Sequence, residues 1–546
     1  MHSTMQDFPL TLGSILRHGT TVHADSEVVT ATAEGMRSMS YGALGERVAQ
    51  LAGGLRELGT TGDERVATFQ WNNVEHLEAY LAVPSMGAVL HTLNIRLFPE
   101  QLTYIANHAE DRVVIVDDSL VDLLAKLLPT FETVTHVLVA GPEAADANLD
   151  ALRESGKEVL LYEEVLAGQP TSFDWPEMDE RDAAAMCYTS GTTGNPKGVV
   201  YSHRSAYLHS MAVGLGVAAG LTWQDRVLPV VPMFHANAWG LAYASVAVGA
   251  SLVMPDRWLQ AEPLVRFMQD AKPTVSGAVP TVWNDVLSYI DEHESDLSSL
   301  RLVLCGGSAV PVALQQALEE RHGINMIQAW GMTETSPVAS IAHPPLGVEG
   351  EDLWRYRATA GRLLPGVEGR IVDDSGETMA NDGESVGELE VRGPWVTASY
   401  YKDDDPEKFH DGWLRTGDVG TMDPLGYLIL TDRAKDVIKS GGEWISSVEL
   451  ENALMAHPDV VEAAVVGIPD ERWQERPLAS VVLREGATTT PDELRAFLSE
   501  SVAKWQLPDA WTFIDAVPRT SVGKFDKKVL RRRYGEGQLD VQLAQS

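Results

Sequence analysis

The pattern of apolar positions between residues 40 and 58 is that of a helix with one buried face. Apolar side chains recur there at intervals of three and four residues, which places them on one side of an α-helix. Ser40 is a suitable N-cap, and Gly59 is a suitable stop. The sequence therefore predicts an amphipathic helix whose apolar stripe consists of Leu44, Val48, Leu51, Leu55 and Leu58.

Short apolar runs alternate with helix-length segments over most of the chain. Before residue 180 the runs lie at 66–69, 113–116 and 136–139, and a helical stretch lies at 74–86. After residue 180 the alternation returns, with runs at 184–189, 252–254, 274–277 and 302–305. This alternation is typical of βα units around a mostly parallel sheet, so we expect two α/β subdomains, at about 1–180 and about 181–358.

The residue composition and the pattern of predicted elements change twice after residue 358. From about 359 to 431, Gly-rich turns separate brief alternating strands such as GELEVRG and GYLILTD, which predicts a small β-barrel or meander. From 432 to 546, strands mix with helices whose starts carry capping boxes, at Ser446 with Glu449 and at Thr490 with Glu493. The expected fold is an α/β domain with a small β-barrel over 1–431, followed by a smaller α+β lid domain over 432–546.

The net charge excludes one class of partner. Lys and Arg total 42 against 78 Asp and Glu, which gives a formal charge of -36. Such a surface repels phosphate backbones and anionic lipid heads, so we expect no nucleic-acid partner. An anionic substrate must then be captured by a local concentration of backbone N–H groups, Lys and Arg.

The two cysteines and the N-terminal segment indicate in which cellular compartment the protein is expected. Cys187 and Cys305 each lie in an apolar run, so no disulfide framework or Cys-based metal site is expected. The N-terminal segment lacks a basic stretch followed by a long apolar run, and no window reaches eighteen uninterrupted apolar residues. We expect neither a signal peptide nor a membrane span, and a cytoplasmic location.

The segment YTSGTTGNPKG at 188–198 is the most informative part of the sequence. Its glycines let the backbone approach an anion, its hydroxyls add donors, and Lys197 supplies charge. It is not a Walker A loop, because Pro196 and Gly198 flank the lysine where that motif requires Gly and a hydroxyl residue. We expect a phosphate-binding loop formed by Thr189, Ser190, Gly191, Thr192, Thr193, Gly194 and Lys197.

Four further motifs follow this loop in the sequence: QAWGMTETSP at 328–337, RTGD at 415–418, DRAKDVIKSGGEWIS at 432–446 and PRTSVGK at 518–524. Together with the loop they resemble the superfamily of adenylate-forming enzymes, which comprises acyl-CoA synthetases, luciferases and peptide-synthetase adenylation domains. The resemblance is closest to bacterial long- and medium-chain fatty-acyl-CoA synthetases, through VVPMFHANAWG at 230–240 and KSGGEWISSVELENAL at 439–454. It implies the adenylate-forming fold, a mobile C-terminal lid and a homodimer paired through the N-terminal segment.

The resemblance also implies a reaction in two steps. A carboxylate and Mg²⁺-bound ATP give an acyl-adenylate and pyrophosphate, and the thiol of CoA then displaces AMP. ATP and CoA are co-substrates, and the fatty acid is the third partner. No covalent enzyme intermediate is needed, and the sequence contains no GxSxG elbow that would support one.

Roles for individual residues in the large domain follow from the same resemblance. Glu334 and Thr189 hold Mg²⁺, as suits a carboxylate in a small-residue turn, and Thr333 touches phosphate. Asp418 holds the ribose hydroxyls. Backbone atoms of Gly307, Gln328 and Ala329 line the adenine. The chain has Ala329-Trp330 where the family frequently has Gly-Tyr, which leaves the shape of the adenine wall open.

The lid residues are assigned in the same way. Asp432 is the hinge. Arg433 reaches the ribose or the phosphates, and Lys435, Lys439 and Trp444 contact the nucleotide. Gly441 and Gly442 let the pantetheine arm of CoA pass. Lys524 lies in a Pro- and Gly-containing loop and stabilises the charge that builds on the phosphates during adenylation. The implied catalytic residues are Lys524, Glu334, Thr189 and His235.

The MFHANAW segment points to the acyl substrate. It is apolar except for one imidazole and one amide, so it suits the border of an acyl channel, in which the resemblance places His235, Ala236 and Trp239. Trp239 would be a gate between the fatty acid and ATP. Amino-acid-activating relatives have Asp directly after the Phe, and this chain has His235 there, so amino acids are disfavoured as substrates.

Several alternatives remain open at this point. The acid could be a short functionalised one such as methylthio-propionate instead of a medium- or long-chain fatty acid. The final acceptor could be a carrier protein, or the enzyme could be a luciferase-like oxygenase. A non-enzymatic adenylate-binding regulator would lack Lys524 or the phosphate loop, and both are present.

Overall fold

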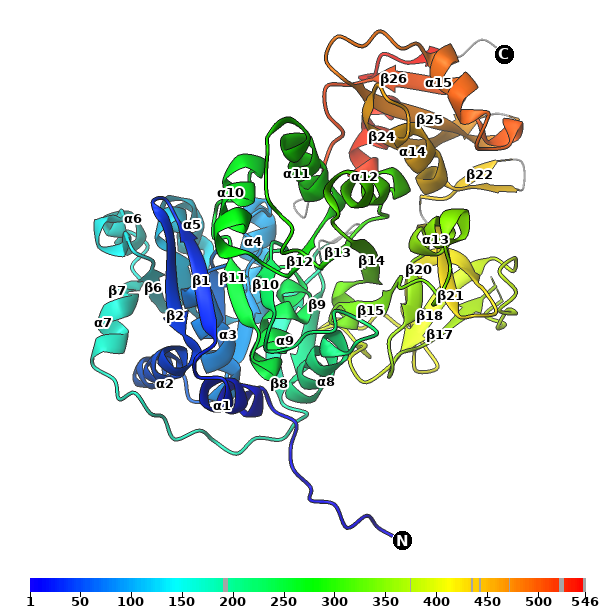
Figure 1. Ribbon diagram of the computed structural model, residues 1–546. Helices are drawn as coiled ribbons and strands as arrows, with labels where there is room; N and C mark the ends of the chain where they lie inside the picture. Colours follow the sequence, from blue (N-terminus) through cyan, green and yellow to red (C-terminus); the bar gives the residue numbers. More distant parts are fainter. Residues whose placement is uncertain are drawn as a thin grey trace.

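Helix α3 (Val74–Ser85) lies between two sheets, and all of its residues are buried (Figure 1). The computed structural model describes residues 1–189, 195–373, 375–433, 436–440, 443–470, 472–519 and 525–543. A helix buried all round is normally apolar, yet α3 carries Glu75 and Glu78. Arg37 donates to Glu75 at 2.7 and 2.6 Å, and Arg47 donates to Glu78 at 2.5 Å. Each buried carboxylate therefore has an ionic partner, as burial requires.

The first sheet runs in the order β7-β6-β5-β3-β4-β8-β9. Its neighbours pair in parallel, except that β9 is antiparallel to β8. The strand at 183–188, expected in the second subdomain, instead extends this sheet, because Leu90 and His91 of β4 pair with Ala185 and Met186. The strands are β3 (Arg65–Phe69), β4 (Val89–Thr92), β5 (Asp111–Asp117), β6 (His136–Ala140), β7 (Glu158–Leu161), β8 (Ala183–Tyr188) and β9 (Gly198–Ser202).

The second sheet combines a parallel and an antiparallel part. Its path runs β17-β18-β20-β21-β16-β15-β14-β13-β12-β10-β11-β1-β2, with β19 beside β20. The parallel part contains β10 (Arg226–Pro229), β11 (Ser251–Met254), β12 (Val275–Ala278), β13 (Leu302–Gly306) and β14 (Met326–Gly331). At one edge β11 pairs with β1 (Glu27–Thr32), which pairs with β2 (Gly35–Ser40), so the chain crosses between the two sheets twice.

The antiparallel part comprises one strand at 338–341 and the Gly-rich region between residues 359 and 431. Its strands continue directly from β14 through β15, and the described pairings end at β17. The region expected as a small β-barrel or meander is thus an antiparallel extension of the second sheet. The strands of the whole antiparallel part are β15 (Val338–Ile341), which precedes the Gly-rich region, and then β16 (Gly361–Leu363), β17 (Glu368–Val372), β18 (Gly387–Arg392), β19 (Phe409–His410), β20 (Trp413–Met422) and β21 (Tyr427–Arg433).

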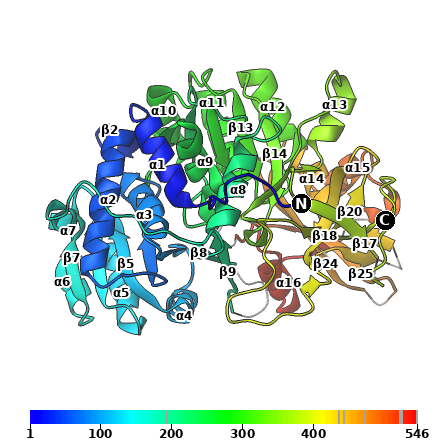
Figure 2. The same ribbon diagram turned by 90° about the horizontal axis from the view of Figure 1, so that it is seen from below.

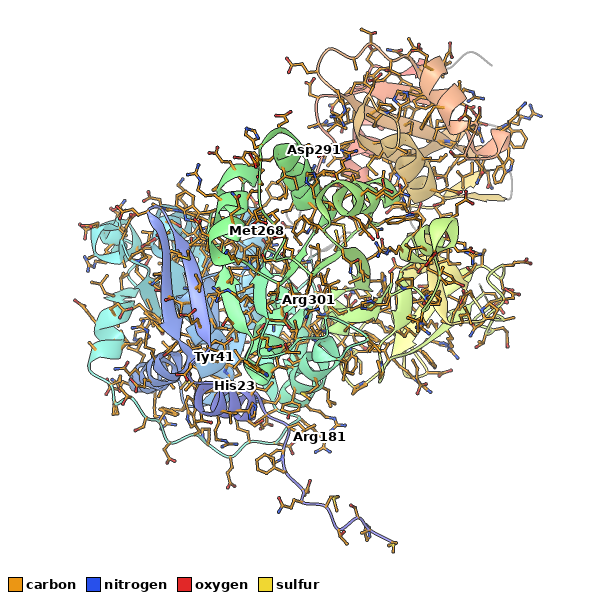
Figure 3. The ribbon with its side chains drawn as sticks, viewed as in Figure 1. His23, Tyr41, Arg181, Met268, Asp291 and Arg301 are labelled. Atoms are coloured by element: carbon orange, nitrogen blue, oxygen red, sulfur yellow. The ribbon has the colours of Figure 1, made fainter. Side chains whose placement is uncertain are left out.

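Helices cover the sheets, and the predicted helix at 40–58 is confirmed as α2 (Tyr41–Glu57). The Ser40 hydroxyl accepts from the Ala43 N–H at 3.2 Å, and Gly59 ends the helix at a φ of 91°. Tyr41, labelled in Figure 3, donates its hydroxyl to the Ala250 carbonyl at 2.5 Å and ties α2 to the second sheet. The other helices of this part are α1 (Leu12–Val22), α4 (Pro99–Ala109), α5 (Val121–Leu127), α6 (Leu149–Arg153), α7 (Tyr162–Ala167), α8 (His203–Gly214), α9 (Leu241–Val248), α10 (Ala261–Ala271), α11 (Pro280–Glu292), α12 (Val312–His322) and α13 (Gly350–Arg357).

The C-terminal segment forms a smaller α+β unit. Its elements are coloured gold to red in Figures 1 and 2, and in Figure 1 they group at the upper right of the molecule, above the yellow antiparallel strands. The capping box of Thr490 and Glu493 is present at α15 (Pro491–Leu498), and the Ser446 hydroxyl accepts from the Glu449 N–H at 3.0 Å. Its other elements are β22 (Ile438–Ser440), β23 (Glu443–Ile445), α14 (Ser447–Met455), β24 (Val460–Asp470), β25 (Gln474–Leu483), β26 (Ala510–Phe513), α16 (Lys527–Gly535) and β27 (Gln542–Leu543).

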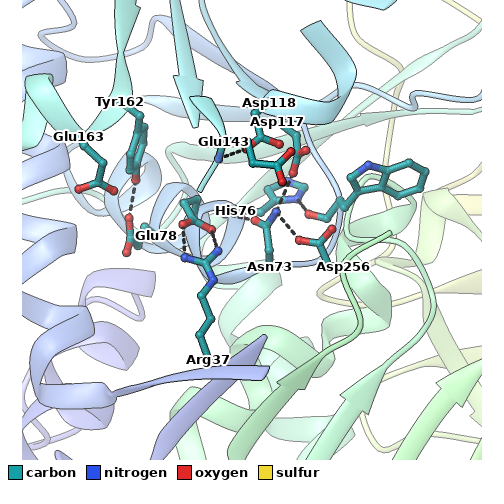
Figure 4. Close-up of polar contacts among 12 residues, drawn as sticks. Arg37, Asn73, His76, Glu78, Asp117, Asp118, Glu143, Tyr162, Glu163 and Asp256 are labelled. Atoms are coloured by element: carbon teal, nitrogen blue, oxygen red, sulfur yellow. Dashed lines mark hydrogen bonds and ion pairs between the residues drawn. The ribbon is translucent and has the colours of Figure 1, made fainter. Parts of the chain in front are cut away.

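Asn73 joins the two sheets through a buried polar cluster (Figure 4). Its side-chain oxygen caps α3 by accepting from the His76 N–H at 3.0 Å. Its amide nitrogen donates to Asp117, at the end of β5, at 2.9 Å and to Asp256, just after β11, at 3.2 Å. Burial, followed by the charge of Asp256, raises the pKa of Asp117 to about 7.

Because of this raised pKa, the stability of the protein depends on pH. Between about pH 4 and 7, the folded protein holds a proton on Asp117 that the unfolded chain releases, so the free energy of unfolding falls as the pH rises through this window. Asp256→Asn removes the neighbouring charge and lowers the pKa of Asp117. We therefore expect the melting temperature of Asp256→Asn to fall less between pH 5 and pH 8 than that of the wild type.

The control is Asp404→Asn, since Asp404 is exposed and the substitution removes one charge far from this cluster in the sequence. Only the difference in slope matters, because Asp256→Asn also changes the hydrogen bond from Asn73. Equal pH slopes in the wild type and Asp256→Asn would contradict the coupling.

Candidate active site

Asn72 holds the segment that leads to the predicted acyl channel. It lies just after β3 of the first sheet, and its amide nitrogen donates to the carbonyls of Pro229 at 2.7 Å and Val231 at 2.9 Å. Its side-chain oxygen accepts from the Met233 N–H at 2.7 Å, and the Tyr80 hydroxyl of α3 donates to the Met233 carbonyl. The carboxyl ends of the two sheets are thereby joined, which is where open α/β sheets place their ligand crevices.

The segment after Met233 has an unusual backbone. Ala236, Asn237, Ala238 and Trp239 have φ values of 43°, 51°, 52° and 57°, and all four residues are buried. The left-handed conformation costs an L-residue about 1–2 kcal/mol, and such strain persists where the surroundings impose it. The Cys187 thiol contributes by donating to the Asn237 side-chain oxygen at 3.0 Å.

The backbone run determines where His235 and Trp239 lie. His235 is half-buried, and its N–H donates to the Pro232 carbonyl at 3.0 Å. Trp239 is 6% exposed, and its indole lies against β12, where a Cβ added to Gly277 would be 3.6 Å from the ring. The same Cβ would lie 2.8 Å from Leu241 Cδ1, so glycine at this position makes room for Leu241, whereas the indole lies at ordinary contact distance.

The stems of the predicted phosphate loop are closed by hydrogen bonds. The Thr189 N–H donates to the Lys197 carbonyl at 2.9 Å, and the Lys197 N–H donates to the Thr189 hydroxyl at 3.2 Å. The Lys197 ammonium contacts Asp405 at 2.5 Å and Asp403 at 3.4 Å, and it lies 4.8 Å from the ring centroid of Tyr400. Partial burial lowers the pKa of Lys197, but the hydrogen bond and charge of Asp405 outweigh it, and the net shift is upward.

Two tyrosines hold the turn that carries Thr333 and Glu334. The Tyr201 hydroxyl, from β9, donates to the Thr333 carbonyl at 2.7 Å. The Tyr400 hydroxyl donates to Glu334 Oε1 at 2.7 Å, and the Thr397 N–H donates to the Glu334 carbonyl at 2.8 Å. Burial, and then the charge of Glu334, raise the pKa of Tyr400, so its hydroxyl keeps its proton and remains a donor. Glu334 itself is 6% exposed.

Predicted nucleotide residues lie near the carboxyl ends of β13 and β14 and in the middle of β20. Asp418 Oδ2 accepts from the Trp330 indole N–H at 2.8 Å, and Asp418 pairs with Arg433 across β20 and β21. Gly306 pairs with Ala329, and a Cβ on Gly306 would lie 2.4 Å from the Ala329 carbonyl oxygen. Gly307 follows at a φ of 86°.

The Gln328 side chain is occupied within the protein. Its oxygen accepts from the Val310 N–H at 2.7 Å, and its amide nitrogen donates to the Thr359 carbonyl at 3.0 Å. The side chain therefore braces the loops around β14, and only its main chain is left to border a nucleotide.

Asp432 connects the large domain to the C-terminal unit. It is the penultimate residue of β21, and its Oδ2 accepts from the N–H of Ser447 at 2.8 Å and from the Ser447 hydroxyl. The expected hinge thus also caps the start of α14. The predicted residues Ser190, Gly191, Thr192, Thr193, Gly194, Lys435, Gly441, Gly442 and Lys524 lie outside the described residues, and the side chains of Arg433, Lys439 and Trp444 lie outside the described side chains.

Sequence reasoning missed the residues that position this site. Asn72, Tyr201, Tyr400 and Asp405 belong to none of the recognised motifs, and Tyr400 is 66 residues away from its partner Glu334. Nothing local in the sequence marks such contacts. Trp330 was noted only as a departure in the adenine wall, whereas it is also the hydrogen-bond donor to Asp418.

The paired strands β8 and β9 that flank the predicted phosphate loop, the clamped turn of Thr333 and Glu334, and the smaller C-terminal unit that follows Asp432 are the features expected of an adenylate-forming enzyme. Solved structures agree. The anthranilate CoA ligase AuaEII in complex with anthranoyl-AMP superposes with a TM-score of 0.87 at 27% identity, covering 98% of this chain and 100% of that one. A benzoate CoA ligase from Burkholderia xenovorans gives a TM-score of 0.81 at 25% identity, over 95% and 99% of the two chains.

The chain belongs to the AMP-binding enzyme family, whose model matches residues 16–401, and the AMP-binding enzyme C-terminal domain matches residues 449–524. It is 43% identical to a 3-methylmercaptopropionyl-CoA ligase of Ruegeria pomeroyi, over 96% of this chain and 97% of the relative. It is 44% identical to a long-chain-fatty-acid–CoA ligase of Thermus thermophilus, over 97% of each. The protein is an AMP-forming acyl-CoA ligase.

No helix in the described part of the chain is long and apolar enough to cross a membrane.

The strained run before Trp239 leads to a prediction about glycine substitution. Ala238→Gly removes a buried methyl group, which costs about 0.8 kcal/mol, but it also relieves about 1–2 kcal/mol of left-handed strain. We expect its free energy of unfolding to lie within about 1 kcal/mol of the wild type.

The matched control is Ala79→Gly, at an equally buried alanine inside α3. There the lost methyl and the helix penalty of about 0.5–1 kcal/mol act in the same direction. Urea unfolding of both variants compares them directly, and equal losses would show that the 236–239 run is unstrained.

Proposed function

We propose that this ligase activates a medium- to long-chain fatty acid. The observation that carries the proposal is the buried run at 236–239, which directly follows the buried Phe234 and the half-buried His235 and is apolar at Ala236, Ala238 and Trp239. His235 occupies the position directly after Phe234 where a carboxylate would be needed to bind an ammonium group. The name of the Thermus thermophilus relative, and of a medium-chain-fatty-acid–CoA ligase of Ectopseudomonas oleovorans at 41% identity, supports this substrate class.

A second candidate is a short thioether acid. Relatives from Ruegeria pomeroyi and Ruegeria lacuscaerulensis, at 43% and 42% identity, are both named 3-methylmercaptopropionyl-CoA ligase. The left-handed turn ending at Trp239 could close a short pocket as well as gate a long channel, because the indole is buried in either case. Identity alone does not separate the two acids.

The proposed chemistry uses the residues gathered at the sheet ends. A carboxylate oxygen of the acid attacks the α-phosphorus of ATP, the bond from this phosphorus to the bridging oxygen breaks, and pyrophosphate leaves. The thiol of CoA then loses its proton, its sulfur attacks the acyl carbon, and AMP leaves with the electrons of the acyl–oxygen bond. Lys197 and Lys524 would stabilise the phosphate charge, Asp418 and Arg433 would orient the ribose, and His235 would border the acyl carboxylate.

Glu334 and Thr189 are the proposed Mg²⁺ ligands. Glu334 fits this role because one of its two carboxylate oxygens is available. Oε1 accepts a hydrogen bond from Tyr400, whereas Oε2 has no hydrogen-bond partner within the described ranges. A hard cation prefers such oxygen ligands. When bound, the ion would neutralise phosphate charge in the adenylation step.

The remaining proposals concern the lid and the quaternary structure. Asp432 would act as the hinge, Lys435, Lys439 and Trp444 as nucleotide contacts, and Gly441 and Gly442 as the passage for pantetheine. A homodimer is supported by residues 1–10, which extend away from the body in Figure 1 and expose Met1, Met5 and Phe8. Sedimentation of the full chain tests the dimer, and a monomer at micromolar concentration would refute it. The cytoplasmic location stays a prediction.

The substrate test measures CoA thioester and AMP formation with acids of about two to sixteen carbons and with 3-methylthiopropionate. Each buried methylene contributes about 0.8 kcal/mol, so kcat/KM is expected to rise about three- to fourfold per carbon until the channel ends. A maximum at acetate or propionate would refute the fatty-acid proposal. A maximum at 3-methylthiopropionate would establish the second candidate.

Three further arms use the same assay. Chelation by EDTA should abolish AMP formation if Glu334 and Thr189 hold Mg²⁺. Replacing CoA with a carrier protein, or recording light emission, tests the other acceptors. In Trp239→Ala, the mutual increase of ATP and acid affinities expected for a gate should disappear, whereas retained coupling would make Trp239 a core residue.

A further inference from the structure

The ammonium group of Lys197 is already engaged by a carboxylate of the same chain. Lys197 Nζ lies 2.5 Å from Asp405 Oδ2 and 3.4 Å from Asp403 Oδ2. The Lys197 side chain is 31% exposed and that of Asp405 is 27% exposed, so the pair is half-buried and partly shielded from solvent. Asp405 thus occupies the kind of position next to the loop lysine that a phosphate oxygen would occupy.

Asp405 is placed there by a fixed turn. The Tyr401 N–H donates to the carbonyl of Gly198, which follows Lys197, at 2.8 Å, and Tyr400 forms a β-bridge with Asp403. The Lys402 ammonium anchors the same turn to Glu110 at 2.6 Å. The ion pair is therefore built by backbone contacts between the 400–405 turn and the stem of the phosphate loop.

The same turn reaches Glu334. The Tyr400 ring lies under the Lys197 ammonium at 4.8 Å, and its hydroxyl donates to Glu334 Oε1 at 2.7 Å. The lysine of the loop, its counter-ion and the proposed metal ligand are thus held by adjacent residues of one segment.

We propose that Asp405 is a positioning residue for Lys197 that competes with ATP. In the enzyme without nucleotide, Asp405 holds the ammonium group at the loop, and the phosphates of ATP must take Lys197 away from it. Asp405 therefore keeps the Lys197 side chain ordered, and it lowers the affinity of the enzyme for ATP. This inference rests on the proposed role of Lys197 in binding phosphate.

The chain offers a closely matched control. Asp404 is the neighbour of Asp405, is exposed, and has no ion pair within the described part of the chain. Asp404→Asn and Asp405→Asn remove the same charge from adjacent positions, so the general attraction of a less acidic surface for ATP is nearly equal in both. A difference between them reports the contact with Lys197.

The experiment measures the Kd for ATP by calorimetry in the wild type, Asp405→Asn, Asp404→Asn, Lys197→Gln and the double variant Lys197→Gln with Asp405→Asn. Exposed to half-buried ion pairs are weak, so we expect Asp405→Asn to bind ATP about two- to fivefold more tightly than Asp404→Asn. In the Lys197→Gln background, Asp405→Asn should increase the affinity for ATP by no more than Asp404→Asn increases it in the wild type. The KM for the acid should not change.

Asp405→Ser serves as a second variant that also removes the carboxylate. Unchanged or weaker ATP binding in both Asp405 variants would overturn the inference, as would a gain in affinity that persists in the Lys197→Gln background. Failure of the proposed function is distinguishable: a wrong substrate class would appear in the acid series as a maximum at acetate, propionate or 3-methylthiopropionate, and a wrong role for Lys197 would appear as an unchanged Kd for ATP in Lys197→Gln.

Discussion

The side chain of Asn72 is the contact on which the position of the active site depends. With three hydrogen bonds it fixes the 229–233 segment of the second sheet to the end of β3 in the first. Its neighbour Asn73 caps α3 and binds a carboxylate from each sheet. Because these bonds are buried, losing one would leave unpaired polar groups inside the protein. Two adjacent asparagines therefore hold the carboxyl ends of the two sheets together.

The local elements could be predicted from the sequence, whereas their assignment to sheets could not. The helix at 41–57 and the strands at 65–69, 111–117 and 302–306 follow from apolar spacing and caps, which are properties of neighbouring residues. The pairing of β4 with β8 and of β1 with β11 joins residues far apart in the sequence. Parallel strands such as β4 of the first sheet and β12 and β13 of the second are buried on two faces, so alternating patterns do not distinguish which sheet such a strand joins.

The sequence predicts a chemistry for the candidate site, but it does not identify the residues that support the site. Glu334, Lys197 and Asp418 lie in motifs whose residue types suit phosphate, metal and ribose. Tyr201 and Tyr400, which hold the Thr333–Glu334 turn, are ordinary tyrosines until the fold brings them there. The sequence contains 78 Asp and Glu against 42 Lys and Arg, and nothing in it distinguishes Asp405 from the other carboxylates. Only the fold shows that the 400–405 turn places Asp405 against Lys197 of the predicted phosphate loop.

Activation of the acid as an adenylate is tested most directly by following the oxygen atoms of the acid's carboxyl group into the products. The acid is labelled with heavy oxygen in both carboxyl positions, and the products formed with ATP and CoA are analysed by mass spectrometry. Attack of the carboxylate on the α-phosphorus predicts one heavy oxygen in each AMP and none in pyrophosphate. Heavy oxygen in inorganic phosphate, with ADP as the nucleotide product, would contradict the account, because it would mean that the acid is activated as an acyl phosphate.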